Sequence, residues 1–175
     1  MSQDFLQEEQ SRQEKWDRRF LELAKHVSTW SKDPSTQVGA VIVRPNTRLV
    51  VGMGYNGFAR GIADSEARLN DRETKYKFVV HAEVNAILAA GERARGCWIY
   101  MYPSFMVPPI CHECAKLAIQ AGIVGIVGYR PDMSDPRVQR WVNSISVAKE
   151  MWDEGGLDVR VYDEIDGGST GCVIG

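Results

Sequence analysis

Helix-forming and strand-forming segments alternate along the second half of the 175-residue chain, and this alternation constrains the fold more than any other feature. AEVNAILAAG (82–91) predicts a helix that ends at a glycine, and the aromatic and β-branched residues of CWIYMY (97–102) predict a strand. CAKLAIQAG (114–122) predicts a second helix, and IVGIVGY (123–129) a buried strand. Strands separated by helices favour a sheet that is covered by helices on both faces.

The first half of the chain adds a helix and a hairpin. Apolar residues at steps of three and four predict an amphipathic helix that stops at Asp33-Pro34. These apolar residues are Trp16, Phe20, Leu23, Val27 and Trp30. VGAVIV (38–43) and RLVVGMG (48–54) predict two strands joined by the turn RPNT. The polar stretch 56–77 predicts a loop with one helical turn.

The last part of the chain predicts one long helix and one strand. Residues 134–156 begin with Ser-Asp, end at two glycines and carry an apolar stripe at helical spacing; its members are Val138, Trp141, Ile145, Ala148 and Trp152. LDVRVYD (157–163) predicts the last strand. The whole order predicts an α/β protein with three layers, α/β/α, around a mixed sheet, in a single domain over 1–165. Residues 166–175 are glycine-rich and predict a flexible tail, in which Cys172 is an incidental thiol.

Composition and charge exclude several classes of protein. Hydrophobic residues make up 44% of the chain, charged residues 25%, and the net charge is -2. No dense basic stripe is present, which argues against a nucleic-acid polymer or an acidic membrane surface as partner. The N-terminus lacks the apolar core of a signal peptide, and no apolar run is long enough to span a bilayer. We therefore expect a cytoplasmic protein, whose paired thiols serve metal binding or catalysis rather than disulfides.

PPICHECAK (108–116) contains a pair of cysteines, and the sequence around it must show whether the pair serves redox chemistry or metal binding. A thioredoxin-type redox pair follows the first strand of its fold, whereas Cys111 and Cys114 come late in the chain, after a hairpin. A metal site needs further ligands, and the chain has three histidines. His26 lies on a helix face, and His112 stands between the cysteines as a spacer, like Glu113.

His81 is the remaining histidine, at the start of a predicted helix. Together with Cys111 and Cys114 it supplies three ligands of the softness that Zn²⁺ prefers. All three lie near predicted helix N-termini, where a thiolate is favoured. Three protein ligands leave one tetrahedral position open, which is the arrangement of a catalytic zinc. Glu83, two residues after His81, can then transfer a proton between water and a substrate nitrogen; the alternative is a glutamate favoured only by the helix dipole.

H-x-E followed by C-x-x-C resembles the signature of the zinc-dependent deaminases. The segments SKDPSTQVGAVIV, VGMGYNGFARG, KYKFVVHAEVNAIL and CHECAKLAIQAGI are similar to the deoxycytidylate (dCMP) deaminase branch of that superfamily. The resemblance implies a cytidine-deaminase-like fold with a five-stranded mixed sheet, one catalytic zinc ion per chain and hydrolysis of dCMP to dUMP and ammonia. It also implies a homo-oligomer, a hexamer, in pyrimidine nucleotide metabolism.

The resemblance assigns roles to individual residues. His81, Cys111 and Cys114 match the zinc ligands, and Glu83 matches the proton shuttle. Asn56, in G-Y-N-G, matches an asparagine that reaches the sugar or base, although the same sequence is also good turn chemistry. Tyr129 resembles an aromatic residue near the substrate, and a strand-end core tyrosine is the alternative interpretation.

Two departures from the family pattern concern the substrate and its regulation. Relatives have proline directly before the first ligand cysteine, whereas Ile110 intervenes here. After G-Y-N-G, the sequence ARGIADSEARLNDRE replaces a cysteine and paired aspartates that belong to a region regulated by dCTP and dTTP. Whether these nucleotides act as effectors therefore stays open.

The substrate of the site also stays open among related molecules. A nucleotide-specific enzyme needs a cation for the phosphate, and the candidates are Arg60, Lys75, Lys77 and Arg130. The alternatives to dCMP are dCTP, deoxycytidine and a 5-substituted dCMP. A zinc-stabilised binding domain without catalysis is the non-enzyme alternative.

Overall fold

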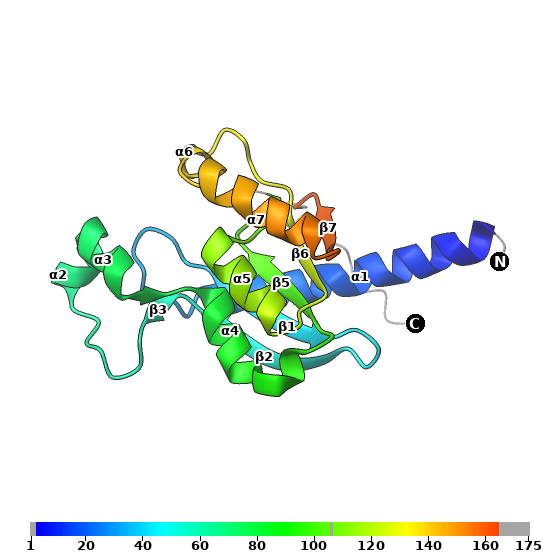
Figure 1. Ribbon diagram of the computed structural model, residues 1–175, viewed down its shortest axis with the longest axis horizontal. Coiled ribbons are helices and arrows are strands. Elements are labelled where there is room, and N and C mark those ends of the chain that lie inside the picture. Colours follow the sequence, from blue (N-terminus) through cyan, green and yellow to red (C-terminus); the bar gives the residue numbers. More distant parts are fainter. Residues whose placement is uncertain (1–2, 106, 165–175) are drawn as a thin grey trace, which may run out of the picture.

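A five-stranded sheet forms the centre of the computed structural model, which describes residues 3–105 and 107–164 (Figure 1). The strand order is β2-β1-β5-β6-β7. These strands are β1 (Gly39–Arg44), β2 (Leu49–Tyr55), β5 (Trp98–Tyr102), β6 (Gly125–Tyr129) and β7 (Asp158–Tyr162). β1 pairs antiparallel with β2 and β5, whereas β6 runs parallel to both β5 and β7. The predicted five-stranded mixed sheet is confirmed.

Helices cover both faces of the sheet. Figure 1 shows α1 (Gln3–Ser28) crossing behind the sheet, while α4 (Ala82–Ala90), α5 (His112–Gln120) and α7 (Val142–Glu154) lie in front of it. A short 3₁₀ helix, η1 (Gly91–Ala94), extends α4. The core is accordingly divided into two buried clusters, one on each side of the sheet.

The sequence of β1 explains why both faces need a cover. Ala40 and Ile42 are buried in the cluster beneath α4, and Val41 and Val43 in the cluster beneath α1. Because successive side chains of a strand point to opposite faces, a run of apolar residues predicts burial on both sides. The helices on either face supply that burial.

Gly54 brings β2 close to the helix that carries His81 and Glu83. A Cβ atom at Gly54 would lie 2.3 Å from the backbone nitrogen of Ala86 and 2.4 Å from the carbonyl oxygen of Ala82. Only glycine allows this approach, which fixes the start of α4 against the sheet. The G-Y-N-G segment therefore positions the candidate site as well as contributing Asn56 to it.

The first helix has different bounds from the predicted ones. It begins at Gln3, where no apolar stripe exists, and pairs such as Arg18 with Glu14 (2.8 Å) stabilise its exposed turns. It ends at Ser28 rather than at Asp33-Pro34, because the hydroxyls of Ser28 and Thr29 donate back to carbonyls one turn earlier. Trp30, predicted on the buried stripe, is consequently 46% exposed.

The stretch 56–77 contains more regular structure than the single helical turn predicted for it. It includes β3 (Gly57–Phe58), α2 (Glu66–Asn70) and most of α3 (Arg72–Phe78). β3 pairs antiparallel with β4 (Val79–Val80), and the carboxylate of Asp71 caps α3 by accepting from the backbone of Thr74. These elements are too short to show a hydrophobic period, so the sequence pattern predicts a loop.

The predicted helix over 134–156 is also interrupted. Asp135 caps α6 (Pro136–Gln139), and α7 starts again at Val142. Four members of the predicted stripe are buried as expected, namely Val138, Ile145, Ala148 and Trp152. The fifth, Trp141, lies at the interruption.

Two sequence predictions concern membranes and the chain end. Across the described ranges, no helix combines the length and apolar character needed to cross a bilayer. The predicted tail, 166–175, with Cys172, lies outside the described residues.

Candidate metal centre and its cavity

Two helix N-termini bring the candidate metal ligands together. His81 is the N-cap residue of α4 and Cys111 is the N-cap residue of α5, while Glu83 and Cys114 lie in the first turns of the same helices. His81 Nδ1 is 3.4 Å from Cys111 Sγ and 3.3 Å from Cys114 Sγ. One potential ligand atom from each of the four residues lies within 4.8 Å of all the others.

The donor atoms fit zinc. One imidazole nitrogen and two thiols are ligands that Zn²⁺ takes, and the geometry brings together the three residues predicted as ligands. The other two histidines lie apart from the cluster. His112 Nδ1 is 2.8 Å from Ser144 Oγ, and His26, which lies on α1, stands edge-on to Trp30.

The two thiols have opposite electrostatic behaviour. The hydrogen bond from Cys114 lowers the pKa of Cys111 to about 4 against the effect of burial, and His81 lowers it further. The pKa of Cys114 is raised, first by its hydrogen bond to Cys111 and then by burial and the Glu83 charge. One thiolate therefore forms readily while a second is opposed by its neighbours. A bound cation removes this opposition, which is the behaviour expected of a metal site.

Burial also changes the ionisation of His81 and Glu83. The hydrogen bond to Cys111 raises the pKa of His81 to about 9, although burial works in the other direction. Glu83 is 6% exposed, and its burial raises the pKa of its carboxyl to about 7. A carboxyl with a pKa near neutrality can both accept and donate a proton, as general acid–base catalysis requires.

The cluster opens onto a cavity that is continuous with solvent. His81, Glu83 and Cys111 form part of its wall, and Ile110 lies beside them. Ile110, the residue that departs from the family pattern, is 2% exposed and belongs to the core beneath α4 and α5. It therefore fills the core next to Cys111 and also forms part of the cavity wall.

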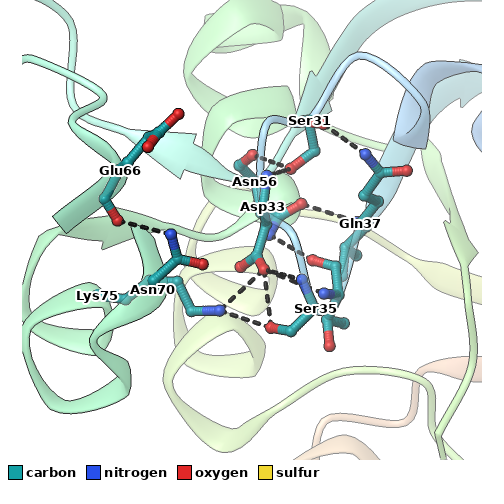
Figure 2. A network of polar contacts seen from close by, with 10 residues as sticks. Ser31, Asp33, Ser35, Gln37, Asn56, Glu66, Asn70 and Lys75 are labelled. Atoms are coloured by element: carbon teal, nitrogen blue, oxygen red, sulfur yellow. Dashed lines mark hydrogen bonds and ion pairs between the residues drawn. The ribbon is translucent and has the colours of Figure 1, made fainter. Parts of the chain in front are cut away.

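Asn56 lies in the cavity wall, as its predicted role requires, and its amide also organises the neighbouring loop (Figure 2). Its Oδ1 accepts from the backbone of Val38 at 2.8 Å, and its Nδ2 donates to the carbonyl of Thr36 at 2.9 Å. Ser31 Oγ donates to the backbone carbonyl of Asn56 at 2.8 Å. An amide NH₂ group has two hydrogens, so one remains available to a ligand.

Tyr129 has a different location. It belongs to the buried cluster on the α1 side of the sheet, and its hydroxyl donates to Glu22 at 2.8 Å. It is not among the described residues that line the cavity with His81; it lines a second hollow, together with Arg130. The structure thus places Asn56 in the wall of the cavity that the metal cluster lines, and places Tyr129 outside the described lining of that cavity.

The four cations predicted as phosphate ligands are also dispersed. Lys75 lies in the cavity wall, where its Nζ donates to Asp33 at 2.8 Å and to Ser35 at 2.6 Å (Figure 2). Arg130 pairs with Asp163 at the second hollow. Arg60 and Lys77 are exposed and do not belong to the described lining of the cavity.

Sequence reasoning missed the contribution of α6 and its end. Arg137, Arg140 and Trp141 all line the cavity. The ring of Trp141 stands edge-on to His81, with centroids 6.3 Å apart and an interplanar angle of 80°. In the sequence, Trp141 fits the apolar stripe of a helix, and no local signal distinguishes it from a core residue.

The α/β/α fold and the His-Cys-Cys cluster with its buried glutamate define a candidate zinc-dependent hydrolytic centre, and comparison with known proteins identifies the family. The profile of the cytidine and deoxycytidylate deaminase zinc-binding region matches residues 14–129. The chain therefore belongs to this family of zinc-binding deaminases.

Individual relatives agree with this assignment. An uncharacterized deaminase in the luxG 3′ region of Aliivibrio fischeri is 41% identical over 147 residues, which are 83% of this chain and 92% of that protein. The deoxycytidylate deaminase of Pongo abelii is 34% identical over 155 residues, 84% of this chain and 79% of that protein. The crystal structure of a dCMP deaminase from the cyanophage S-TIM5, in complex with dCMP and dUMP, gives a TM-score of 0.60 at 22% identity, over 82% of this chain and 94% of that chain. The predicted cytidine-deaminase-like fold is confirmed.

Proposed function

We propose that the protein hydrolyses dCMP to dUMP and ammonia. The observation that carries this proposal is the buried Glu83 carboxyl, which lies in one cluster with His81, Cys111 and Cys114 on the wall of an open cavity. A purely structural zinc site has no use for that carboxyl. The substrate follows from the relatives, because the protein from Pongo abelii is a deoxycytidylate deaminase and the cyanophage enzyme was crystallised with dCMP and dUMP.

His81, Cys111 and Cys114 would hold the zinc ion, which when bound supplies a Lewis acid that makes water a nucleophile near neutral pH. Glu83 accepts a proton from the attacking water and donates it to N3 of the cytosine ring. It then transfers a second proton to the amino group at C4. The C4–N bond breaks, ammonia leaves, and the water oxygen remains as the C4 carbonyl of dUMP.

The environment of Glu83 suits both proton transfers. Its pKa of about 7, raised by burial, lies near the pH at which the carboxyl alternates most easily between its two forms. Glu83 is 6% exposed and lines the cavity, so its protons are exchanged with groups that occupy the cavity.

The Glu83→Gln substitution tests this role, because it keeps the shape of the side chain and removes its ability to carry a proton. We expect the variant to retain zinc and to lose at least about a hundredfold in kcat for dCMP. Glu113→Gln is the matched control, since Glu113 is exposed between the two cysteines and pairs with Lys116. Near-normal turnover by Glu83→Gln with full zinc occupancy would contradict the proposal.

Asn56 and Tyr129 stay proposals as substrate contacts. Asn56 is supported by its position in the cavity wall and by its Nδ2 group, which has one hydrogen bond to a described residue and two hydrogens to donate. Tyr129 has no such support, because its hydroxyl already donates to Glu22. Asn56→Ala should raise KM for dCMP more than Tyr129→Phe does, and kinetics of the two variants decides the point.

We further propose a single domain over 1–165 that acts in the cytoplasm as a homohexamer. The support for the compartment is the buried free thiols Cys97, Cys111 and Cys114, which suit a reducing environment. Sedimentation tests the hexamer. Assays of dCMP, CMP, dCTP, deoxycytidine and cytosine, with and without dCTP and dTTP, test the substrate and both effectors. Bound zinc without turnover of any of these would favour a binding domain.

A further inference from the structure

Three cationic side chains line the cavity in the described part of the chain: Lys75, Arg137 and Arg140. A substrate that carries a phosphate needs a cation whose charge is available to it, so these three are the candidates within the cavity. They differ in how far their charge is already neutralised by the protein.

Lys75 is neutralised by a buried ion pair. Its side chain is 7% exposed and that of Asp33 is 8% exposed, and their Nζ–Oδ1 distance is 2.8 Å. Asp33 Oδ1 also accepts from the backbone nitrogens of Ser35 and Thr36. Figure 2 shows the Lys75 amine directed at Asp33 and Ser35. This arrangement ties α3 to the loop after α1, and its charges compensate each other.

Arg137 and Arg140 carry an excess of positive charge. Arg137 pairs with Asp135 through Nε and Nη2, with a shortest distance of 2.6 Å, and it stacks over Phe105 at 4.9 Å. The guanidinium group of Arg140 forms no hydrogen bond or ion pair with a described residue, it is exposed, and its charge lowers the pKa of Asp135 only after the closer contacts of Arg137. Two guanidinium groups therefore share one carboxylate, which leaves one positive charge uncompensated at this part of the cavity.

The local backbone places the two arginines on the same side. Arg137 lies in α6, and Arg140 is its C-cap residue with helical torsion angles. Residues three apart on a helix are neighbours on its surface. Trp141, the next residue, stands edge-on to the candidate ligand His81. Arg140 is thus adjacent in sequence to an aromatic ring that contacts the candidate ligand His81, and both arginines line the same cavity.

We infer that Arg140, assisted by Arg137, binds the 5′-phosphate of the nucleotide substrate and makes the enzyme select a nucleotide over a nucleoside. This inference rests on the proposed deaminase function and adds the residue that distinguishes the two substrate classes. Guanidinium groups are well suited to the task, because their planar donors bind phosphate oxygens in pairs. Lys75 then contributes to the shape of the cavity rather than to phosphate binding.

The test compares kcat/KM for dCMP and for deoxycytidine in the wild type and in Arg140→Gln. We expect the variant to lose about 10- to 100-fold with dCMP, the value of a hydrogen bond to a charged group. With deoxycytidine, which lacks the phosphate, we expect no loss. Arg137→Gln should show the same selectivity with a smaller loss, and Arg140→Lys should recover part of the activity with dCMP.

Arg60→Gln is the control, because it removes the same charge from an exposed position outside the described cavity lining. Unchanged kcat/KM for dCMP in Arg140→Gln, or an equal loss with both substrates, would overturn the phosphate assignment alone. A wild-type enzyme that converts neither dCMP nor deoxycytidine would overturn the proposed function instead. The two failures are therefore distinguishable in one set of assays.

Discussion

One part of the cavity wall comes from two helix N-termini, whereas another part comes from segments that are far apart in the sequence. The metal wall is the cluster of His81, Glu83, Cys111 and Cys114, of which the first three line the cavity. Each of its two pairs lies within a single helical turn. The polar wall consists of Asp33, Ser35 and Lys75, and its ion pair joins residues that are 42 positions apart. The metal wall contains the groups that we propose to react, and the polar wall holds the loop that carries Thr36 and Val38, the hydrogen-bond partners of Asn56.

The two walls are held in place by different interactions. The helices of the metal wall pack on the central sheet, and their first residues are fixed by the backbone, with Gly54 allowing β2 to approach α4. The polar wall depends on a buried ion pair whose partners belong to α3 and to the loop after α1. We therefore expect substitutions in the metal wall to abolish activity and substitutions in the polar wall to reduce stability.

The largest effect is expected from Cys114→Ser. Replacing this ligand should reduce zinc content well below one ion per chain and lower turnover by at least about a hundredfold, since even residues that only support zinc ligands cost 10–100-fold. Metal analysis and dCMP turnover check this. Cys97→Ser is the control, because Cys97 is buried, lies outside the ligand cluster and contacts the carbonyl of Arg93. Equal loss of zinc in both variants would contradict the assignment of the ligands.

A smaller effect, on stability, is expected from Lys75→Met. Removing the lysine leaves the Asp33 carboxylate buried without its counter-charge, which should lower the free energy of unfolding by about 3 kcal/mol. Lys77→Met, on an exposed residue of the same helix, should change it by less than about 0.5 kcal/mol. Denaturant unfolding of the two variants at neutral pH measures the difference. Equal stabilities would show that the polar wall does not depend on the ion pair.

The smallest effect is a dependence of stability on acid pH. Burial acts to raise the pKa of Asp33, but hydrogen bonds from Lys75, Ser35 and Thr36 outweigh it and lower the pKa below the ordinary value of 3.8. The unfolded chain then takes up this proton before the folded chain does. The stabilisation is complete above about pH 4 and is lost as the pH falls through the lower, folded-state pKa.

Asp33→Asn provides the comparison for this pH effect. The difference in free energy of unfolding between the wild type and Asp33→Asn should be constant near neutral pH and should narrow below about pH 4. Unfolding of both proteins at each pH cancels the effects of other titrating groups. A difference that stays constant into acid would contradict the role given to the carboxylate.

Local patterns made the metal wall predictable. H-x-E and C-x-x-C each place their residues in one helical turn, and the identity of the ligands follows from the preference of zinc for nitrogen and sulfur. The strands of the central sheet were predictable for the same reason, because a short run of apolar or β-branched residues such as 38–43 indicates a strand from its own sequence. The convergence of the two helix starts depends on the whole sheet; the chemistry of the ligands predicted it, and the resemblance to a family strengthened that prediction.

The remainder of the cavity depends on contacts that have no local signal. Lys75 reads as a surface cation until the fold brings it to Asp33. The interruption between α6 and α7 places Arg140 and Trp141 at the cavity, whereas the sequence pattern predicts one unbroken helix there. The short elements between Gly57 and Val80 are stabilised by caps and pairing across the chain, which a hydrophobic period does not reveal.

Hydrolytic deamination of dCMP is tested most directly by following the oxygen atom of water into the product. The zinc-loaded protein is incubated with dCMP in water labelled with heavy oxygen, and the products are analysed by mass spectrometry together with ammonia release. We expect dUMP with one labelled oxygen at C4 and one ammonia for each dUMP formed. Unchanged dCMP in the presence of a fully loaded zinc site would contradict this expectation.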